Sequence, residues 1–325
     1  MEKIYLPEGG YSETNENKGV LRSVSALEWA MNEGRIVEGM AVRCDEELRL
    51  HVDLGCARGI IEPDECVWCR AGEERKDIAI ITRVGKPVAC KITAIETCGD
   101  EIRARLSRRE AQRECMEYYM EHLIPGDVLD ARVTHMESFG AFLDIGCGVP
   151  SLLSVDSISV SRISHPRDRL SVGMKIPALV KYVNRESERI YTTVRELLGT
   201  WEENARAFEV GQTVTGIIRS VEPYGVFIEL SPNLAGLAEV REEEAAFLKE
   251  RIGHRVAVYV KSIVPERMKI KLVLIDVHST SPAGRTPLSF SKACGTGGHV
   301  SLWRYSPESS GRVVETRFDA SVSTL

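Results

Sequence analysis

Glu137-Ser-Phe-Gly-Ala-Phe-Leu-Asp-Ile-Gly146 returns later in the chain as Glu222-Pro-Tyr-Gly-Val-Phe-Ile-Glu-Leu-Ser231, with aromatic, glycine, aliphatic and acidic residues in the same order. Each phrase follows a strand-like run that begins at Gly126 or Gly211. Each is followed by a pair of strand-like runs, the first of them centred on a lysine. A repeat of this size indicates a string of small modules, and function is then a property of each module.

The rest of the chain divides into strand-rich stretches and short helices. Residues 35–107 predict short strands, among them Asp77–Thr82, in an order like that of the later modules but without the aromatic phrase. From Ser107 to Leu123 the apolar residues Ala111, Cys115 and Tyr119 fall on one helical face, which predicts a helix. The predicted organisation is an N-terminal segment with a short helix (1–34), a degenerate module (35–107), a linker helix (108–124), a complete module (125–198), a second linker helix (199–208), a second complete module (209–276) and a flexible tail with a short hairpin (277–325).

Each complete module contains about five strands in roughly 70 residues, which is typical of a small closed barrel of the OB type. The sequence therefore predicts an all-β fold, with tandem OB-fold five-stranded barrels joined by short linker helices. In such a barrel, alternate residues of a strand point inward and outward. This alternation places Phe142 with Asp144, and Phe227 with Glu229, on the solvent face, with both carboxylates expected to be solvated.

The first aromatic of each phrase nominally faces inward. Gly140 and Gly225 permit a bulge that would turn Phe139 and Tyr224 outward. The two rings of a phrase would then lie about 10 Å apart along the strand. Exposed rings can stack on unpaired bases, and basic side chains nearby can contact phosphates. The basic or histidine residues expected to do so are Lys181, Arg189 and His135 in the first complete module and Arg219, Lys261 and Lys269 in the second.

The composition of the 325 residues sets limits on the kind of protein this is. A net charge of −6 argues against an overall positive field, so nucleic-acid binding has to rest on a local surface. Because the chain has no apolar run of about 18 residues and its start is not typical of a secretory signal, we expect a cytoplasmic protein without a membrane partner. The nine cysteines are then expected to be free thiols.

The sequence offers no nucleophile–base pair and no cluster of carboxylates for a metal, so we expect a protein that is not an enzyme and that has no cofactor. Cys66-Val-Trp-Cys69 has the spacing of a metal or redox pair, with Cys44, Cys56, Cys90, Cys98 and His51 in the same module. A metal-dependent activity in this first module is one alternative hypothesis.

The two aromatic phrases, together with the lysine strand and the cation that opens the last strand, resemble the S1 RNA-binding domain, the repeated module of bacterial ribosomal protein S1 and its relatives. The segment His165-Pro-Arg-Asp-Arg-Leu-Ser-Val-Gly173 also fits this resemblance. It covers residues 125–198 and 209–276 well and 35–107 weakly, similar to shorter three-module relatives of Gram-positive bacteria. It implies single-stranded RNA binding, with the RNA-facing aromatics at Phe139 and Phe142, and at Tyr224 and Phe227. The basic residue of the last strand falls at Arg189 and Lys269.

The leading hypothesis is therefore non-enzymatic binding of single-stranded RNA, such as mRNA, in translation or RNA metabolism, with the ribosome as a further partner. The middle module is expected to be the stronger binder, because Glu239 and Glu242-Glu-Glu244 of the last module would repel phosphate. A different hypothesis makes the protein an interaction scaffold of the translation or RNA-decay machinery, with degenerate barrels that no longer bind RNA.

Overall fold

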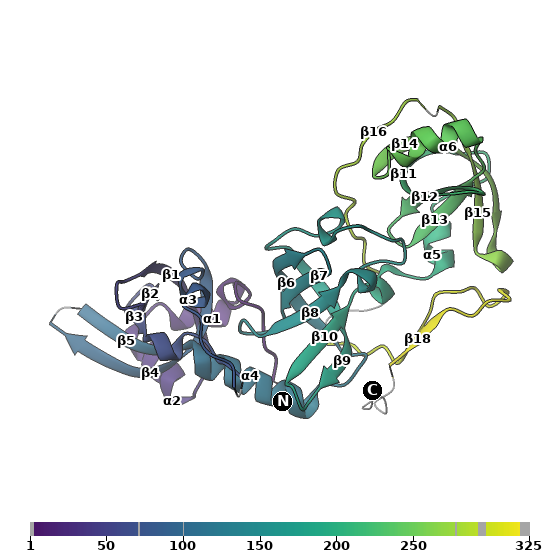
Figure 1. Cartoon of the computed structure of the whole chain (residues 1–325). Helices are drawn as coiled ribbons and strands as arrows, with labels where there is room; N and C mark the ends of the chain where they lie inside the picture. Colours follow the sequence, from purple (N-terminus) through teal and green to yellow (C-terminus); the bar gives the residue numbers. More distant parts are fainter. Residues whose placement is uncertain (1–2, 71, 100, 277, 292–296, 319–325) are drawn as a thin grey trace.

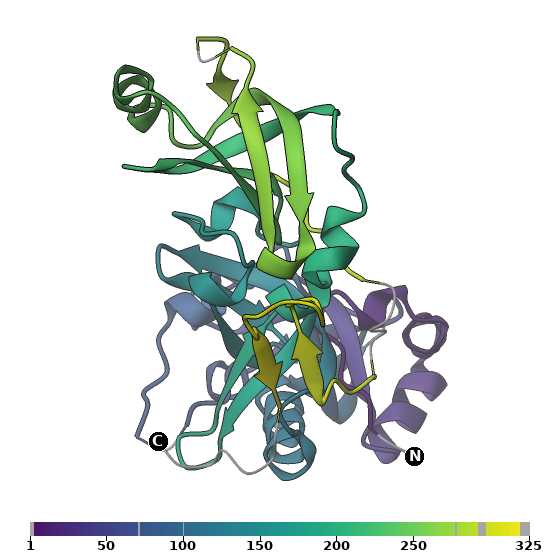
Figure 2. The same cartoon turned by 90° about the vertical axis from the view of Figure 1, so that its right-hand side faces the viewer.

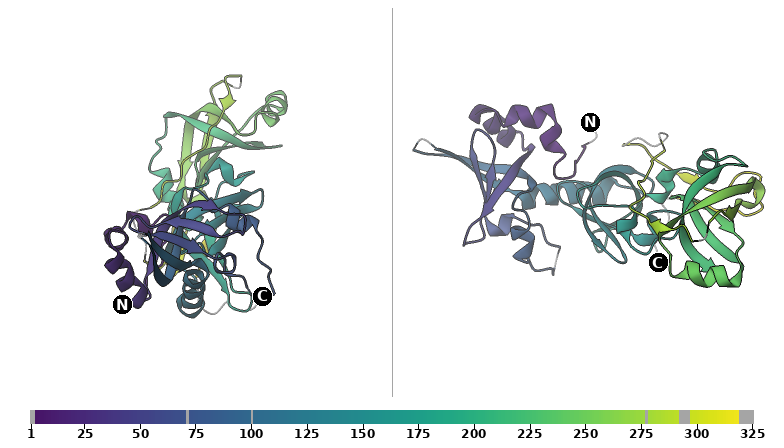
Figure 3. Two further views of the ribbon diagram at one scale, coloured as in Figure 1. Left: turned by 90° about the vertical axis from the view of Figure 1, so that its left-hand side faces the viewer. Right: turned by 90° about the horizontal axis from the view of Figure 1, so that it is seen from above.

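Three five-stranded β-barrels follow one another along the chain in the computed structural model, which describes residues 3–70, 72–99, 101–276, 278–291 and 297–318 (Figure 1). Seen from above, the first barrel lies at one end of the molecule and the third at the other (Figure 3). The predicted all-β fold of tandem barrels is confirmed. In each barrel the first strand pairs with the fourth, and the third pairs in parallel with the fifth.

The first barrel is built from β1 (Ile36–Cys44), β2 (Leu50–Asp53), β3 (Arg58–Ile61), β4 (Pro87–Cys98) and β5 (Glu101–Ser107). Before it come η1 (Tyr11–Glu13), α1 (Asn15–Val20) and α2 (Val24–Asn32), and between β3 and β4 lie η2 (Pro63–Glu65) and α3 (Ile78–Ile81). The strand predicted at Asp77–Thr82 is wrong. Five other strands already close the barrel, and this segment forms one helical turn that buries Ile80. The apolar run is too short for its periodicity to distinguish a helix from a strand.

Helix α4 (Arg108–His122) joins the first two barrels. Ser107 caps its N-terminus, with a side chain that accepts a hydrogen bond from the Glu110 N–H, and the predicted apolar face of Ala111, Cys115, Tyr119 and Leu123 is buried. The extended segment around Tyr5 to Glu8 packs against the same helix and the second barrel, since Tyr5 belongs to that barrel's core cluster. The N-terminal segment thus fills the junction between the first two barrels.

The second barrel consists of β6 (Val128–Glu137), β7 (Gly140–Asp144), β8 (Pro150–Ser154), β9 (Lys175–Asn184) and β10 (Arg189–Thr193), with η3 (Val155–Ser157) and η4 (Pro166–Asp168) between β8 and β9. A short linker follows, formed by η5 (Arg195–Leu198) and α5 (Trp201–Ala205). The third barrel consists of β11 (Thr213–Glu222), β12 (Gly225–Ser231), β13 (Leu234–Ala238), β14 (His254–Val264) and β15 (Lys269–Leu274), with α6 (Glu242–Lys249) and η6 (Pro265–Arg267) between its strands.

The C-terminal region is packed against the barrels over its described residues, where the sequence predicts a flexible tail. Strand β16 (Ser281–Pro282) pairs with β14, and the chain then runs back along the second barrel. A hairpin of β17 (Leu302–Arg304) and β18 (Glu315–Arg317) follows, drawn in yellow in Figure 2. Its Trp303 is buried in a core cluster with residues of both the second and the third barrel. Local composition gives no sign of this packing, because the region is rich in Ser, Thr and Gly and shows little apolar periodicity.

Candidate nucleic-acid interface

An exposed aromatic ring stands at the turn before β7 and at the turn before β12. Phe139 is 56% exposed and Tyr224 is 63% exposed. Each forms an edge-to-face pair with the half-buried aromatic of the following strand, Phe142 or Phe227, with 6.2 Å between ring centroids in both barrels. The outward orientation matches the expectation, but the expected spacing of about 10 Å is wrong. The first ring lies in a turn and folds back toward the strand.

The glycines of the two phrases do not form bulges at the positions expected of them. A Cβ atom at Gly140 would lie 2.5 Å from the carbonyl oxygen of Leu153, and one at Gly225 would lie 2.5 Å from that of Ala238. At both sites glycine therefore lets the next strand approach closely. The register shifts lie instead in the preceding strands, between Val133 and His135 and between Ile218 and Ser220.

Strand register connects Phe142 to a line of side chains around the outside of the second barrel. These residues face one another across successive strands, and we call them the outer row: His135, Phe142, Leu152, Tyr191 and Tyr182. His135 stacks near Phe142 with centroids 6.3 Å apart, and Tyr182 stacks near Tyr191 at 6.0 Å. Residues beside the row, such as Leu143 and Ile190, are buried, which shows that the row points outward.

Sequence reasoning missed Tyr182 and Tyr191. Comparison of the two repeats does not reveal them, because the corresponding outer-row positions of the third barrel hold Ser262 and Lys271. The third-barrel row consists of Ser220, Phe227, Leu237, Lys271 and Ser262. The first-barrel row consists of Arg43, His51, Ile60, Arg105 and Ala94. Aromatic rings therefore concentrate on the second barrel.

Four of the predicted cations lie beside these rows on exposed positions. Lys181 and Lys261 occupy irregular positions of β9 and β14, where the register shifts. Lys181 donates to the Ser157 hydroxyl at 3.0 Å. Arg189 opens β10, and one of its guanidinium nitrogens lies 3.8 Å from a carboxylate oxygen of Glu73 in the first barrel.

Lys261 and Lys269 make no ion pair with any residue that the structure describes. His135, which is exposed, lies 2.6 Å from a carboxylate oxygen of Glu137. Arg219 differs from the other predicted residues. Its side chain is only 12% exposed, and its Nε donates to Glu229 at 2.7 Å. Arg219 therefore sits in an ion-pair cluster, away from the open surface.

The acidic residues of the two phrases are buried, so the expectation that they are solvated is wrong. Asp144 is 3% exposed because the N-terminal segment covers it, and it accepts hydrogen bonds from the backbone N–H groups of Glu8, Gly146 and Gly148. Burial, and then the charge of Glu8, raises the pKa of Asp144 to about 7. Glu8 itself pairs with Arg108, which lowers the pKa of the Glu8 carboxyl against the opposing effect of burial.

Glu229, at the equivalent position of the third barrel, is also buried, at 2% exposed, but among the described residues its carboxylate is bound by arginine side chains and not by backbone N–H groups. Both Arg219 and the fully buried Arg169 donate to its carboxylate. Period-2 alternation correctly predicted that these acids lie on the outer face of their strands. It could not predict that other segments of the chain cover this face and exclude solvent from the carboxylates.

The described residues offer no group of three or more His, Cys, Asp or Glu side chains that could hold a metal ion. Cys66 and Cys69 are free thiols, and burial raises the pKa of Cys66 to about 12. The side chain of Cys98, weighed as a possible ligand, lies outside the described part of the structure. None of the described helices is both long enough and apolar enough to cross a bilayer.

Comparison with known proteins gives a match for the second barrel. Residues 123–195 match the family described as "S1 RNA binding domain". The small ribosomal subunit protein bS1 of Staphylococcus aureus is 28% identical over 163 residues, which are 49% of this chain and 41% of that protein. The bS1 protein of Staphylococcus epidermidis is 34% identical over 124 residues, or 38% and 31% of the two chains. The match thus spans less than half the length of these relatives.

Among solved structures, a multidomain protein with nucleic acid binding domains from Streptococcus pneumoniae is 15% identical, with coverage of 75% and 74% of the two chains and a TM-score of 0.24. The second barrel, with its aromatic phrase and outer row, is the part that the family description matches. Residues 123–195, which include the second barrel, match the S1 RNA-binding domain family, and the chain is similar over part of its length to ribosomal protein bS1.

Proposed function

We propose that this protein binds single-stranded RNA, such as mRNA, without catalysing a reaction, and that the second barrel is its main binding surface. The observation that carries the proposal is the outer row of the second barrel, where three aromatic rings and a histidine ring lie on one solvent-facing line. Stacking of a base on an aromatic ring contributes about 1–3 kcal/mol and tolerates any base, because every base has a π-face.

Cations beside the row supply the second part of the surface. Lys181 and Arg189 lie on the two strands that carry Tyr182 and Tyr191, so that bases stacked on the tyrosines would leave their phosphates near these side chains. The net charge of −6 gives no general attraction for RNA. Binding would therefore be confined to this surface and to the weaker one around Tyr224 and Phe227 in the third barrel.

The proposed cellular setting follows from the relatives. The bS1 proteins carry the name of a small ribosomal subunit protein, which supports a role in translation, in the cytoplasm, with the ribosome as a partner. The outer row of the first barrel holds Arg43, His51 and Arg105 and has no aromatic ring apart from the histidine. This difference supports a separate task for that barrel, such as contact with a protein partner.

The test is the affinity for a fluorescent, unstructured RNA of the wild type and of the double variant Phe142→Ala with Phe227→Ala. Loss of two stacking rings should weaken binding at least about tenfold. Trp29→Ala is a matched control, since it removes an exposed aromatic that lies on α2, outside every outer row. Equal affinity of wild type and double variant would refute the stacking mechanism.

Salt dependence separates this proposal from the scaffold hypothesis. Binding through phosphates releases counterions, so the logarithm of the binding constant should fall by about 0.7 per phosphate contact for each tenfold rise in salt. A scaffold whose barrels do not bind RNA would give no measurable RNA complex even at low salt.

A further inference from the structure

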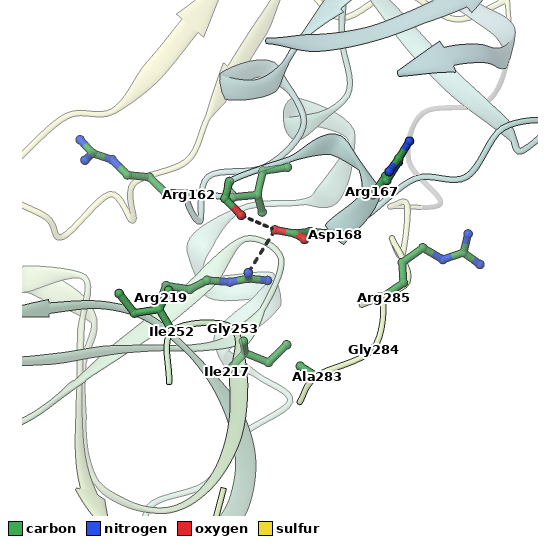
Figure 4. A pocket seen from close by; sticks show the side chains of 12 residues that line it. Arg162, Arg167, Asp168, Ile217, Arg219, Ile252, Gly253, Ala283, Gly284 and Arg285 are labelled. Carbon is green, nitrogen blue, oxygen red and sulfur yellow. Dashed lines mark hydrogen bonds and ion pairs between the residues drawn. The ribbon is translucent and has the colours of Figure 1, made fainter. Parts of the chain in front are cut away.

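A cavity of about 410 Å³ lies at the junction of the second and third barrels (Figure 4). Three parts of the chain form its walls: the loop around η4 in the second barrel, β11 with residues 252–253 in the third, and residues 283–285 of the C-terminal region. Its charged lining residues are Arg162, Arg167, Asp168, Arg219 and Arg285. Four arginines against one acid make this an unusual lining for a protein of net charge −6.

The walls are held together by backbone hydrogen bonds. The N–H of Ala283 donates to the carbonyl of Gly253 at 3.1 Å, which joins the C-terminal region to the third barrel. The N–H of Thr286 donates to the carbonyl of Asp168 at 3.1 Å, which joins the same region to the second barrel. The cavity is therefore part of a bonded junction between three segments.

The floor of the cavity is close to charge balance. Arg219 bridges Asp168, at 3.4 Å, and Glu229, which also pairs with the buried Arg169. Two guanidinium groups thus meet two carboxylates. Even so, Nε and Nη1 of Arg169 have no hydrogen-bond partner among the described residues, and a buried unpaired donor destabilises its surroundings.

The rim carries the excess positive charge. Arg162, Arg167 and Arg285 are all exposed, and their side chains make no ion pair or hydrogen bond with any residue in the described ranges. Figure 4 shows Arg162 on one side of the cavity and Arg167 with Arg285 on the other. The three guanidinium groups point outward from the cavity, so an RNA backbone that crosses the junction would pass unpaired groups that bind phosphate oxygens in a planar, bidentate manner.

The cavity also lies next to the outer rows of both barrels. Arg219 directly precedes Ser220, which faces Phe227 in the third-barrel row. On the other side, the loop that carries Arg162 and Arg167 leads to Met174, whose carbonyl accepts from the N–H of Val133 at 2.9 Å. Val133 is two residues from His135, the end of the second-barrel row. An RNA strand that passed between these two ends of the rows would run beside this junction.

We propose that the junction arginines Arg162, Arg167 and Arg285 bind phosphodiester groups of a single RNA strand where it passes from the second barrel to the third. This inference rests on the proposed function. It adds that the two barrels act as one continuous site, so that a long RNA gains affinity that a short RNA, able to occupy only one barrel, does not.

The experiment compares the full-length wild type with the triple variant Arg162→Ala, Arg167→Ala, Arg285→Ala on two oligouridylates, one of about 5 nucleotides and one of about 20, a range that spans the site sizes of OB barrels. Because the three side chains are exposed and unpaired, the variant should keep its fold. The long RNA should bind at least about tenfold more weakly, with a salt slope reduced by up to about 2, while the short RNA binds as before.

A second triple variant, Arg22→Ala, Arg113→Ala, Arg206→Ala, removes the same charge from exposed positions elsewhere and serves as the control. An equal loss of long-RNA affinity in both triple variants, or a loss that extends to the short RNA, would overturn the proposal. So would calorimetric binding of uridine monophosphate alone that disappears in the junction variant while RNA affinity at both lengths is unchanged, since the anion would then be a free nucleotide.

The proposed function fails in a different way. If it is wrong, Phe142→Ala leaves the affinity for the short RNA unchanged, whatever the junction variant does. If only the junction proposal is wrong, Phe142→Ala weakens binding of both RNAs, and the junction variant behaves as the wild type.

Discussion

The second and third barrels share one topology and one aromatic phrase, yet they differ in what surrounds that phrase. In the second barrel the outer row continues from Phe142 to Tyr191 and Tyr182, whereas the third-barrel row continues from Phe227 to Lys271 and Ser262. The buried acid of the phrase also differs in its partners: backbone N–H groups hold Asp144, and two arginines hold Glu229. A shared motif therefore sets the position of the ring, while its neighbours across the strands set the surface.

The largest expected difference between the barrels concerns their buried acids. Glu229→Ala leaves Arg169 buried without a carboxylate, which should cost about 3–5 kcal/mol in free energy of unfolding. Asp144→Asn keeps an acceptor for Gly146 and Gly148 but turns an amide N–H₂ toward the N–H of Glu8, for a cost of about 1–3 kcal/mol. Urea unfolding followed by tryptophan fluorescence measures both. Equal costs would show that the two acids have equivalent surroundings.

The outer rows predict the next largest difference, in RNA affinity. Tyr191→Ala should weaken binding by roughly 1–3 kcal/mol through loss of a stacking ring, and Tyr191→Phe should restore most of that loss. Lys271→Ala, at the matching position of the third barrel, should instead reduce the salt slope by about 0.7. Fluorescence anisotropy at several salt concentrations checks this. A Tyr191→Phe variant as weak as Tyr191→Ala would argue for the hydroxyl and against stacking.

The raised pKa of Asp144 predicts that the second barrel is more stable at lower pH. A carboxyl whose folded pKa of about 7 lies above its ordinary value of 3.8 favours folding when it is protonated. Its contribution to stability therefore grows as the pH falls from above 7 toward 4, by up to about 1.4 kcal/mol per pH unit. Burial also raises the pKa of Glu38, which adds a slope of the same sign.

The unfolding midpoint in urea, measured between pH 8 and pH 5, follows this effect. Asp144→Asn should flatten part of the rise, and Glu117→Gln, on the exposed side of α4, should leave it unchanged. An identical pH profile for Asp144→Asn and wild type would mean that Asp144 does not titrate in this range.

The smallest expected effect comes from the contact between Arg189 and Glu73. In the second barrel this acid competes with phosphate for the guanidinium group, whereas Lys269, at the matching position of the third barrel, has no acidic partner within the described residues. Since exposed ion pairs contribute about 0–1 kcal/mol, Glu73→Gln should raise RNA affinity no more than about fivefold. Glu74→Gln is the neighbouring control, and an equal gain from both variants would indicate a general charge effect.

Much of the architecture follows from local pattern. The repeat, the period-2 alternation of Ala141, Leu143 and Ile145, and the helical face of α4 depend on residues close in sequence, so they could be predicted. The run at Asp77–Thr82 could not be, because four apolar residues suit a helical turn and a strand equally well. The packing of the C-terminal region depends on a few separated residues such as Trp303, which local composition does not reveal.

The candidate site likewise contains residues that the local sequence predicts and residues that only the tertiary structure brings together. Phe139, Phe142, Tyr224 and Phe227 were identified from the sequence because the phrase repeats. Strand alternation accounts for the outward position of Phe142 and Phe227, whereas Phe139 and Tyr224 are exposed because they lie in the turns before β7 and β12. Tyr182 and Tyr191 join the site through strand register alone, and the junction arginines come together only when two barrels and the C-terminal region meet. The sequence by itself determined the barrels and their four rings, since periodicity and repetition are local properties. The tertiary structure decided which acids are buried, which cations stay free and where the two surfaces meet, because those depend on contacts between residues far apart in the chain.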